Sequence, residues 1–393
     1  MTGPAHLIAR PNPVFLGTFC DERRKPTRPV DFRGETFDRD FDDASLFFDA
    51  FEAAPGRTVL QGPPFLNLGG ALSKTQFSVG PTICRTRSRD LDRHAQVWLE
   101  TPANISRLRA SGPLGEFEIA VARCATSLFD GRRVIFTLSR NNPIPWILDW
   151  VRFNRDIHGA DAVLIYDNAS TDYDSAALSR ALSAVDGLER SVVVEWPFKY
   201  GPQGVDARRF WDSDFCQLGA LEHARWRFLQ DAASVMNSDI DEFVLPAQGK
   251  SVFEATEKSR TGFIGYHGRW VVGIADRGPS PAGAALPRHR DYDIVQREVM
   301  RRSRLLVTRD RNRCQPKWTL APRRCPILAQ WKVHTIGGWW SSHLAGAGFS
   351  FRHFREIGSN WKYPRTGHEV FDPARHEEDA ALRAAYARVS WDR

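Results

Sequence analysis

The segment RVIFTLSRNNPIPWILDWVRFNRDIHGADAVLIYD, residues 133–167, alternates between two kinds of pattern. Residues 133–139 form a compact run of β-branched and aromatic side chains, which is typical of a buried strand. Pro145 then stands where a first helical turn tolerates proline, and the apolar residues after it recur at helical spacing. Gly159 supplies a helix stop, and residues 162–166 are a second apolar run. The segment therefore predicts strand, helix and strand in succession.

The same alternation continues along the chain. We expect Thr171 or Asp172 to cap a helix over residues 173–185, and a third strand at 191–196. A long helix is predicted over residues 207–230, and it leads into a fourth strand that ends in the acidic sequence SDIDE. Strands that alternate with helices predict a parallel sheet with crossover helices, which is the α/β class.

Polar clusters follow three of the predicted strands. They are SRNN (139–142), DNASTD (167–172) and SDIDE (238–242). In parallel sheets, ligands bind beyond the carboxyl ends of the strands. Because all three clusters fall at such ends, the sequence predicts a ligand site at this edge of the sheet.

Three regions differ in composition. Residues 1–128 are rich in Pro, Gly and Asp with short apolar alternations, which predicts a β-rich N-terminal accessory region. Residues 129–370 carry the α/β pattern and the polar clusters. Residues 371–393 are expected to form a C-terminal helical tail. The six cysteines are widely scattered without any C-x-x-C, which argues against a disulfide framework or a zinc ribbon.

The positive charge of the chain is concentrated in one segment. The formal net charge is +7, yet residues 288–332 alone contain thirteen Lys or Arg against four acids. Such a block suits phosphate-bearing partners or an anionic membrane surface, and a solvated basic face is the plainer alternative. The first twenty residues lack a signal-peptide pattern, so we expect a cytoplasmic protein, with peripheral contact at the inner membrane face as an option.

The acids of SDIDE are the strongest metal candidates. An Asp-x-Asp spacing occurs seven times in the chain and is weak evidence alone. Asp239 and Asp241 differ from the other pairs because apolar residues precede, separate and follow them. If they end a strand, their side chains point the same way and can share one Mg²⁺ or Mn²⁺ ion. The alternative is that nearby arginines neutralise them.

Other candidates surround this pair in the sequence. Asp167 can accept a hydrogen bond from a base or a ribose hydroxyl, although the cluster that contains it also reads as an ordinary loop before a helix. His334, His343 and His353 lie within twenty residues of one another, and His334 is a candidate third metal ligand. Basic side chains that can neutralise a diphosphate are Lys317, Arg323, Arg324, Arg355, Lys362 and Arg365.

Taken together, the motifs SRNNPIPWILDW, YDNASTD, NSDIDEFVLP, WKVHTIGG and HFREIGSNWKYPR resemble bacterial glycosyltransferases of the family 2 and family 92 type. The resemblance covers about residues 132–365. It implies the type-A glycosyltransferase fold, a Rossmann-like α/β domain that binds a nucleotide-sugar donor and a divalent metal. By this resemblance, Asp239, Asp241 and His334 bind the metal and Asp167 contacts the nucleoside. With the basic side chains and the polar clusters added, the residues expected to bind the donor are Ser139, Arg140, Asp167, Asn168, Lys317, Arg355 and Lys362. The usual Arg-Asn-Glu after the first strand is Arg140-Asn141-Asn142 here, so one acid is missing.

The resemblance implies a metal-dependent transfer of a sugar from a nucleotide-diphosphate sugar, above all a UDP-sugar, to a hydroxyl of a glycan or lipid-linked acceptor. Mn²⁺ or Mg²⁺ is the expected cofactor, and Glu242 and His353 are the candidates for the catalytic base. One alternative is a sugar nucleotidyltransferase, although TLSRNNP offers no Gly-rich phosphate loop. The other is an Arg-rich protein that binds nucleic acid or polysaccharide without catalysis; we expect no nucleic-acid partner, because that reading leaves the buried acids unexplained.

Overall fold

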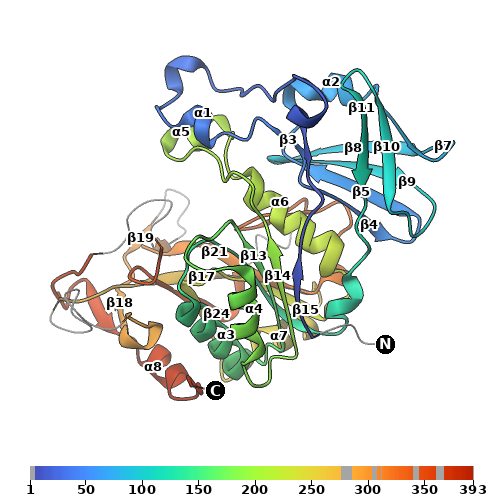
Figure 1. Cartoon of the computed structure of the whole chain (residues 1–393). Helices are drawn as coiled ribbons and strands as arrows, with labels where there is room; N and C mark the ends of the chain where they lie inside the picture. The colour runs from blue at the N-terminus through green and yellow to red at the C-terminus, as the bar shows by residue number, and fades with distance from the viewer. Residues whose placement is uncertain are drawn as a thin grey trace.

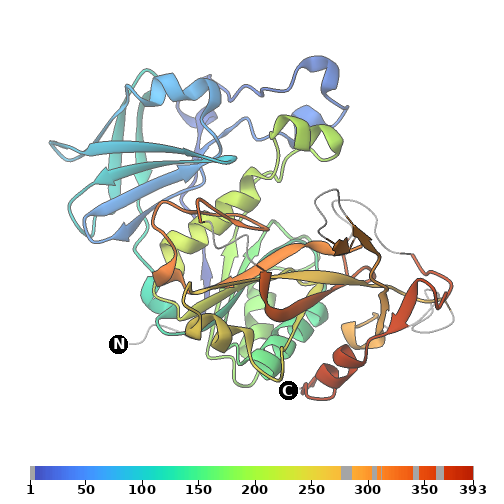
Figure 2. The ribbon, with the colours of Figure 1, turned by 180° about the vertical axis from the view of Figure 1, so that it is seen from behind.

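The chain forms an upper part from its N-terminal region and a lower part built on one large sheet (Figures 1 and 2). The computed structural model describes residues 5–275, 286–302, 308–310, 312–339, 345–359 and 367–392. Within these ranges no helix combines the length and the apolar character that crossing a membrane requires.

The large sheet joins eleven strands within the described residues. In spatial order they are β1 (His6–Ala9), β14 (Arg190–Glu195), β13 (Ala162–Asp167), β12 (Arg133–Ser139), β15 (Ser234–Asn237), β21 (Cys314–Leu320), β17 (Phe263–Val271), β18 (Ile294–Gln296) and β25 (His376–Glu378), with β24 (Ala345–Phe354) beside β17 and β16 (Glu242–Leu245) beside β24. The first five strands in this order, namely β1, β14, β13, β12 and β15, are parallel to one another. The next strand, β21, is antiparallel to both of its neighbours. The predicted α/β class is confirmed, but the sheet is mixed, not parallel throughout.

Helices cover both faces of the parallel strands. They are α3 (Ile144–His158), α4 (Ser175–Ser183), α6 (Phe215–His223) and α7 (Val252–Lys258). Alternate residues of a strand point to opposite faces, so Val163 and Ile165 join one core with α3 and α4 while Leu164 and Tyr166 join another with α6. The strands predicted at residues 133–139, 162–166 and 191–196 thus read as continuous apolar runs because both of their faces are buried.

Two helix predictions need correction. The N-cap of α4 is Asp174, whose side chain accepts from the Ala177 N–H, and neither Thr171 nor Asp172. The long helix expected over residues 207–230 is instead α5 (Val205–Phe210), a break, α6 and a π-helical turn at Ala224–Phe228. At the break, Asp212 and Asp214 form ion pairs with Arg28 and Arg93 of the N-terminal region. These contacts hold the segment in a non-helical path that local periodicity does not reveal.

The upper part is an antiparallel β structure with its own core. One sheet contains β4 (Asp49–Ala54), β5 (Arg57–Gly62), β9 (His94–Glu100) and β8 (Arg85–Leu91); the other contains β11 (Gly115–Ala120), β10 (Arg107–Gly112), β6 (Gln76–Val79) and β7 (Thr82–Ile83). The N-terminal region is therefore β-rich, as expected. Its first strand, β1, nevertheless belongs to the large sheet of the lower part.

Shorter elements complete the structure. They are β2 (Val14–Phe15) paired with β3 (Ser45–Phe47), α1 (Phe37–Asp40), α2 (Gly69–Leu72), β19 (Met300–Arg302) paired with β20 (Thr308–Asp310), β22 (Gln330–Trp331) paired with β23 (Ile336–Gly337), and α8 (Ala380–Tyr386). The C-terminal tail is thus part helix, and through β25 it is also part of the large sheet.

A buried polar chain connects the upper and lower parts. The Tyr166 hydroxyl lies 2.6 Å from His223 Nδ1, and His223 Nε2 lies 2.8 Å from Asp49 Oδ2. Arg227 donates to the same carboxylate at 2.8 Å. Burial lowers the pKa of His223 to about 4, so the imidazole is neutral at pH 7 and can donate one hydrogen bond and accept another. Because β4, α6 and β13 each contribute one member, this chain fixes how the two parts meet.

Candidate metal centre

The order of the parallel strands reverses its direction at β12. The chain runs from β12 through β13 to β14 in one direction, and then returns to the other side of β12 as β15. Ligands of open α/β sheets bind where the direction reverses in this way. The polar clusters that follow β12, β13 and β15 therefore meet at one edge, as the sequence predicted.

The two aspartates of the SDIDE cluster lie on a turn between β15 and β16. The Glu242 N–H donates to the Asp239 carbonyl at 3.0 Å, which closes the turn. The expectation that Asp239 and Asp241 end a strand and point the same way is therefore not met. Asp239 Oδ2 lies 2.7 Å from Lys317 Nζ, whereas Asp241 Oδ2 lies 3.0 Å from His353 Nε2.

Glu242 lies between these two pairs and is fully buried. Its Oε2 accepts from the Asp239 N–H at 2.9 Å and lies 3.1 Å from Lys317 Nζ, and its Oε1 lies 3.7 Å from His353 Nδ1. Burial raises the pKa of Glu242 to about 7, although the positive charge of Lys317 acts in the opposite direction. Burial disfavours the charged form of Lys317, but the charges of Asp239 and Glu242 outweigh it and raise the pKa of this lysine.

His353 reaches the cluster through strand pairing. It stands on β24 directly opposite Glu242 in the antiparallel β16–β24 pair. The Trp270 ring stacks on its imidazole, with ring centroids 4.3 Å apart and an interplanar angle of 25°. The imidazole is therefore held by a strand, a ring and two carboxylates, a degree of fixation that suits a metal ligand.

Asp241, Glu242 and His353 form a group that fits a divalent metal. One ligand atom from each lies within 4.8 Å of the other two. Asp239 lies beside this group, and Lys317 contacts both Asp239 and Glu242. A donor set of carboxylate oxygens and imidazole suits Mn²⁺ better than Mg²⁺, which prefers oxygen alone.

The structure groups only some of the predicted site residues. Asp239, Asp241, Glu242, Lys317 and His353 come together in the cluster. The other predicted metal ligand, His334, is exposed and lies outside the Asp241 group, with its Nδ1 2.9 Å from the Pro316 carbonyl oxygen. The third histidine of that segment, His343, lies outside the described residues.

The predicted donor-binding residues have mixed surroundings. Asp167 ends β13 and accepts from the Ser170 N–H at 3.1 Å and the Ser170 hydroxyl at 2.5 Å, while burial raises the pKa of its carboxyl group. Asn168 is buried and donates to the carbonyls of Trp196 and Phe198, which makes it a support for the loop after β14.

The other residues predicted to bind the nucleotide sugar lie at the same edge of the sheet, except Arg355, which directly follows β24, and Lys362. Ser139 is buried, and its hydroxyl accepts a hydrogen bond from the Asn142 side chain at 2.9 Å. The backbone carbonyl of Arg140 accepts a hydrogen bond from the Ser359 hydroxyl. Arg355 is ion-paired with Glu369 at 2.8 Å. Lys362 lies outside the described residues.

Sequence reasoning missed the contribution of Trp270 and the proximity of His353 to Asp241. Trp270 stacks on the imidazole from one side, and Arg355 lies over the same indole, 5.2 Å from the ring centroid. No local signal in the sequence marks this arrangement, because it depends on β17, β16 and β24 lying side by side. No protein-family model matches this chain, and a search of curated proteins finds no match either.

Proposed function

We propose that this protein is a metal-dependent glycosyltransferase that takes its sugar from a nucleotide-diphosphate donor. The observation that supports it most is the group of Asp241, Glu242 and His353 beside Lys317, at the edge where the strand order reverses. A cation-binding group and a buried lysine suit a diphosphate, because both stabilise the negative charge that develops as the nucleotide leaves. The resemblance of the motifs to glycosyltransferases of the type-A fold agrees with this assignment.

We infer one orientation of the nucleotide-sugar donor along this edge of the sheet. Asp167 and the turn after β15 belong to strands separated only by β12, which corresponds to about 10 Å at the usual strand spacing. That spacing suits a nucleoside at Asp167 and a diphosphate at the metal centre. Bound there by Asp241, Glu242 and His353, a divalent metal would supply Lewis-acid stabilisation of the leaving diphosphate.

The acids of the cluster differ in how exposed their side chains are, and we infer different roles for them from this difference. The Asp239 side chain is 38% exposed, whereas that of Glu242 is only 2% exposed. We therefore assign Glu242 to holding Lys317 and the metal, and Asp239 to the side that meets the donor. Glu242 and His353 were the candidates for the catalytic base, but both lie in the ligand group, so we assign neither to accepting the acceptor's proton.

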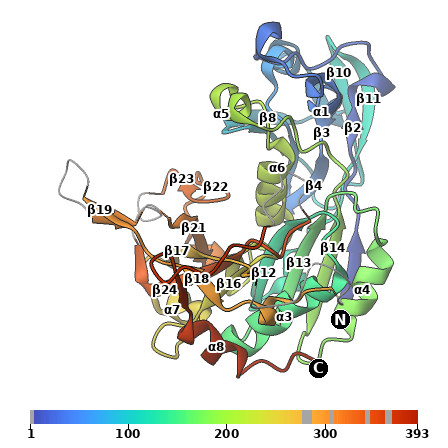
Figure 3. The same ribbon diagram turned by 90° about the vertical axis from the view of Figure 1, so that its left-hand side faces the viewer.

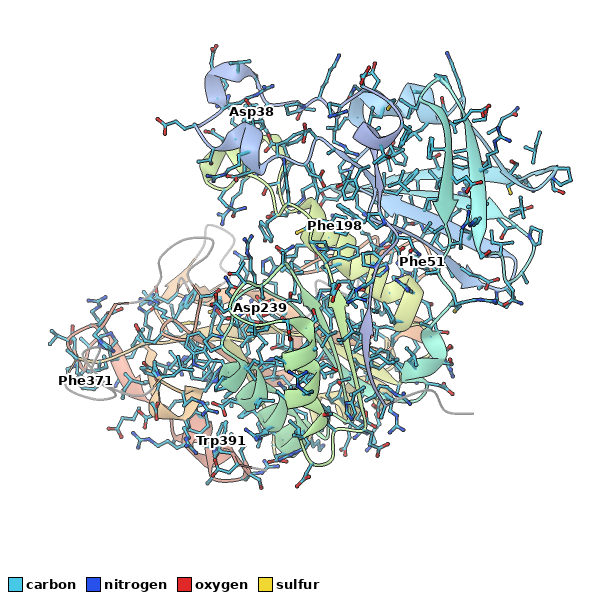
Figure 4. All side chains as sticks on the ribbon, viewed as in Figure 1. Asp38, Phe51, Phe198, Asp239, Phe371 and Trp391 are labelled. Carbon is cyan, nitrogen blue, oxygen red and sulfur yellow. The ribbon has the colours of Figure 1, made fainter. Side chains whose placement is uncertain are left out.

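Calorimetric titration with a panel of nucleotide sugars tests the proposal. One donor should bind with Mn²⁺ present and bind at least tenfold more weakly without it or in Asp241→Asn. Asp38→Asn is the matched control, because Asp38 also belongs to an Asp-x-Asp pair but is 86% exposed and lies on the upper part, away from Asp239 (Figure 4). Metal-independent binding, or equal binding by Asp241→Asn, would contradict the proposal.

The released product distinguishes this function from that of a nucleotidyltransferase. Slow hydrolysis of the bound donor without acceptor should release a nucleoside diphosphate and a free sugar. Formation of pyrophosphate from a nucleoside triphosphate and a sugar phosphate would instead favour the nucleotidyltransferase alternative. The same assay with an acceptor panel identifies the hydroxyl that receives the sugar.

A further inference from the structure

A turn at residues 326–329 exposes two aliphatic side chains, and none of its residues belongs to the metal-centre group. The Ala329 N–H donates to the Pro326 carbonyl at 2.9 Å, which closes a turn with Ile327 and Leu328 at its two middle positions. Ile327 is 61% exposed and Leu328 is 67% exposed. Two adjacent aliphatic side chains at the corner of a turn are unusual, because turns ordinarily present Gly, Asn, Asp or Ser there.

The backbone of this turn is firmly held. Arg225, which is 1% exposed, donates to the carbonyls of Pro326 at 2.9 Å and Ile327 at 3.3 Å, and also to that of Ala329. Arg89 donates to the Leu328 carbonyl at 3.2 Å. These contacts leave little freedom for the two aliphatic side chains to turn inward, so their exposure is a built feature of the fold.

The next residue connects the turn to the upper part. The Gln330 side chain donates to the Asp92 carbonyl at 2.8 Å and accepts from the Asp92 N–H at 2.9 Å. Asp92 lies in the hairpin between β8 and β9, and Figure 3 shows β22, which begins at Gln330, beside α6 and below β8. The turn therefore lies next to β8.

Several arginines lie near the turn on the side that faces β8. Arg85, Arg87 and Arg89 occupy alternate positions of β8 and share one face of the strand. Arg87 is exposed, and within the described part of the chain it forms no ion pair. Arg324, just before the turn, is also exposed and donates to a backbone carbonyl, that of Ser259. Arg85 forms an ion pair with Glu100 at 3.6 Å. The positive charge beside the aliphatic pair that no ion pair neutralises within the described residues therefore belongs to Arg87 and Arg324.

We propose that the Ile327–Leu328 turn inserts into the interface of an anionic lipid bilayer while Arg87 and Arg324 contact the lipid headgroups. Aliphatic insertion and attraction to anionic lipid reinforce each other, since each side chain alone gives only weak membrane binding. A protein partner would need a broad patch, because stable interfaces bury about 800 Å² per partner. Here the aliphatic exposure is confined to two side chains at a turn. The proposal does not depend on the assigned enzymatic activity.

Vesicle flotation of the full chain tests this inference. We expect binding to phosphatidylcholine vesicles that contain phosphatidylglycerol, little binding to pure phosphatidylcholine, and weaker binding at high salt. The double variant Ile327→Ser/Leu328→Ser should lose at least about tenfold in affinity, because two aliphatic side chains no longer leave water. Arg87→Gln and Arg324→Gln should each lose about fivefold.

Matched controls separate docking from folding. Val30→Ser removes an aliphatic side chain that is 72% exposed elsewhere, and Arg180→Gln removes an exposed arginine of α4; both should bind like the wild type. Equal thermal unfolding of the variants confirms that their folds are intact. Absent binding, equal binding to neutral vesicles, or full binding by the double serine variant would overturn the proposal. So would a dimer in sedimentation that dissociates in the Ile327→Ser/Leu328→Ser variant, since a second copy would then be the occupant.

Discussion

Lys317 Nζ lies 2.7 Å from Asp239 Oδ2, a contact that joins β21 to the turn after β15. The lysine is buried, and it is also 3.1 Å from Glu242. The acids of the turn are therefore neutralised in part by a lysine on an antiparallel strand. This arrangement leaves Asp241 and His353 on the other side of Glu242, where the metal centre is proposed.

Replacing Lys317 with methionine should destabilise the fold. The variant keeps the volume of the side chain but leaves the buried Glu242 without its cation. Removal of one partner of a buried ion pair typically costs about 3 kcal/mol or more. Urea unfolding of Lys317→Met measures the loss in the free energy of unfolding. Lys74→Met, at an exposed lysine, is the control and should change it by less than about 0.5 kcal/mol; equal effects of the two substitutions would contradict the assigned role of Lys317.

Mn²⁺ alone should stabilise the protein against unfolding. An ion that binds only the folded state adds about 2.7 kcal/mol at one hundred times its dissociation constant. We expect the melting temperature to rise with Mn²⁺ concentration in the wild type and in Asp38→Asn. Asp241→Asn and His353→Ala should remove the rise, because each deletes one atom of the proposed ligand group. A rise that survives in both variants would place the metal elsewhere.

Acid should destabilise the fold in part through His94. Burial is the main cause that lowers the pKa of this histidine to about 3, from an ordinary value near 6.5. Since the unfolded chain binds the proton more readily, the stability contributed by neutral His94 is present above pH 6.5 and is lost as the pH falls toward 3. Between these limits the loss approaches about 1.4 kcal/mol per pH unit.

Denaturation curves at intervals from pH 7 to pH 4 measure this dependence. His94→Leu should show a shallower decline than the wild type, whatever its stability at pH 7. The replacement is apt because His94 is fully buried and leucine has a similar volume without a group that titrates. An unchanged slope would mean that His94 is accessible to protons in the folded protein.

Gly268 should tolerate no side chain. It lies on β17, where a Cβ atom would overlap the buried ring of Phe351 on β24. We expect Gly268→Ala to cost about 1–3 kcal/mol, the usual range for overpacking a core. The matched control is Gly70→Ala, where nothing lies within 4 Å of the added atom. Loss of Mn²⁺ binding in Gly268→Ala would further show that β24 must stay in register to present His353.

The parallel part of the fold was predictable from local patterns. The segment 133–167 specifies β12, α3 and β13 because buried strands and amphipathic helices have different apolar periods. Gly159 ends α3 as expected, since its backbone takes the left-handed conformation with φ of 72°. The edge at which the polar clusters gather follows from the alternation of strands and helices, and the sequence contained that information.

The composition of the site was only partly predictable. Asp239, Asp241 and Glu242 are marked by their apolar surroundings, and these residues do lie together. The sequence placed the aspartates on a strand and chose His334 as a third ligand, whereas the structure forms a turn and places His353 beside Asp241. The choice between the two histidines could not be made from spacing, because each is more than ninety residues from the aspartates.

Local sequence patterns therefore specified the strands and helices of residues 133–196 and the acids that are set among apolar residues, since both depend on neighbours along the chain. Only the tertiary structure decided that β21 runs antiparallel beside β15 and that β24 pairs with β16. Those pairings bring Lys317 and His353 to Glu242 from positions 75 and 111 residues away. The physical reason is that strand register is selected by burial of whole faces of the sheet, a condition that no single segment satisfies alone.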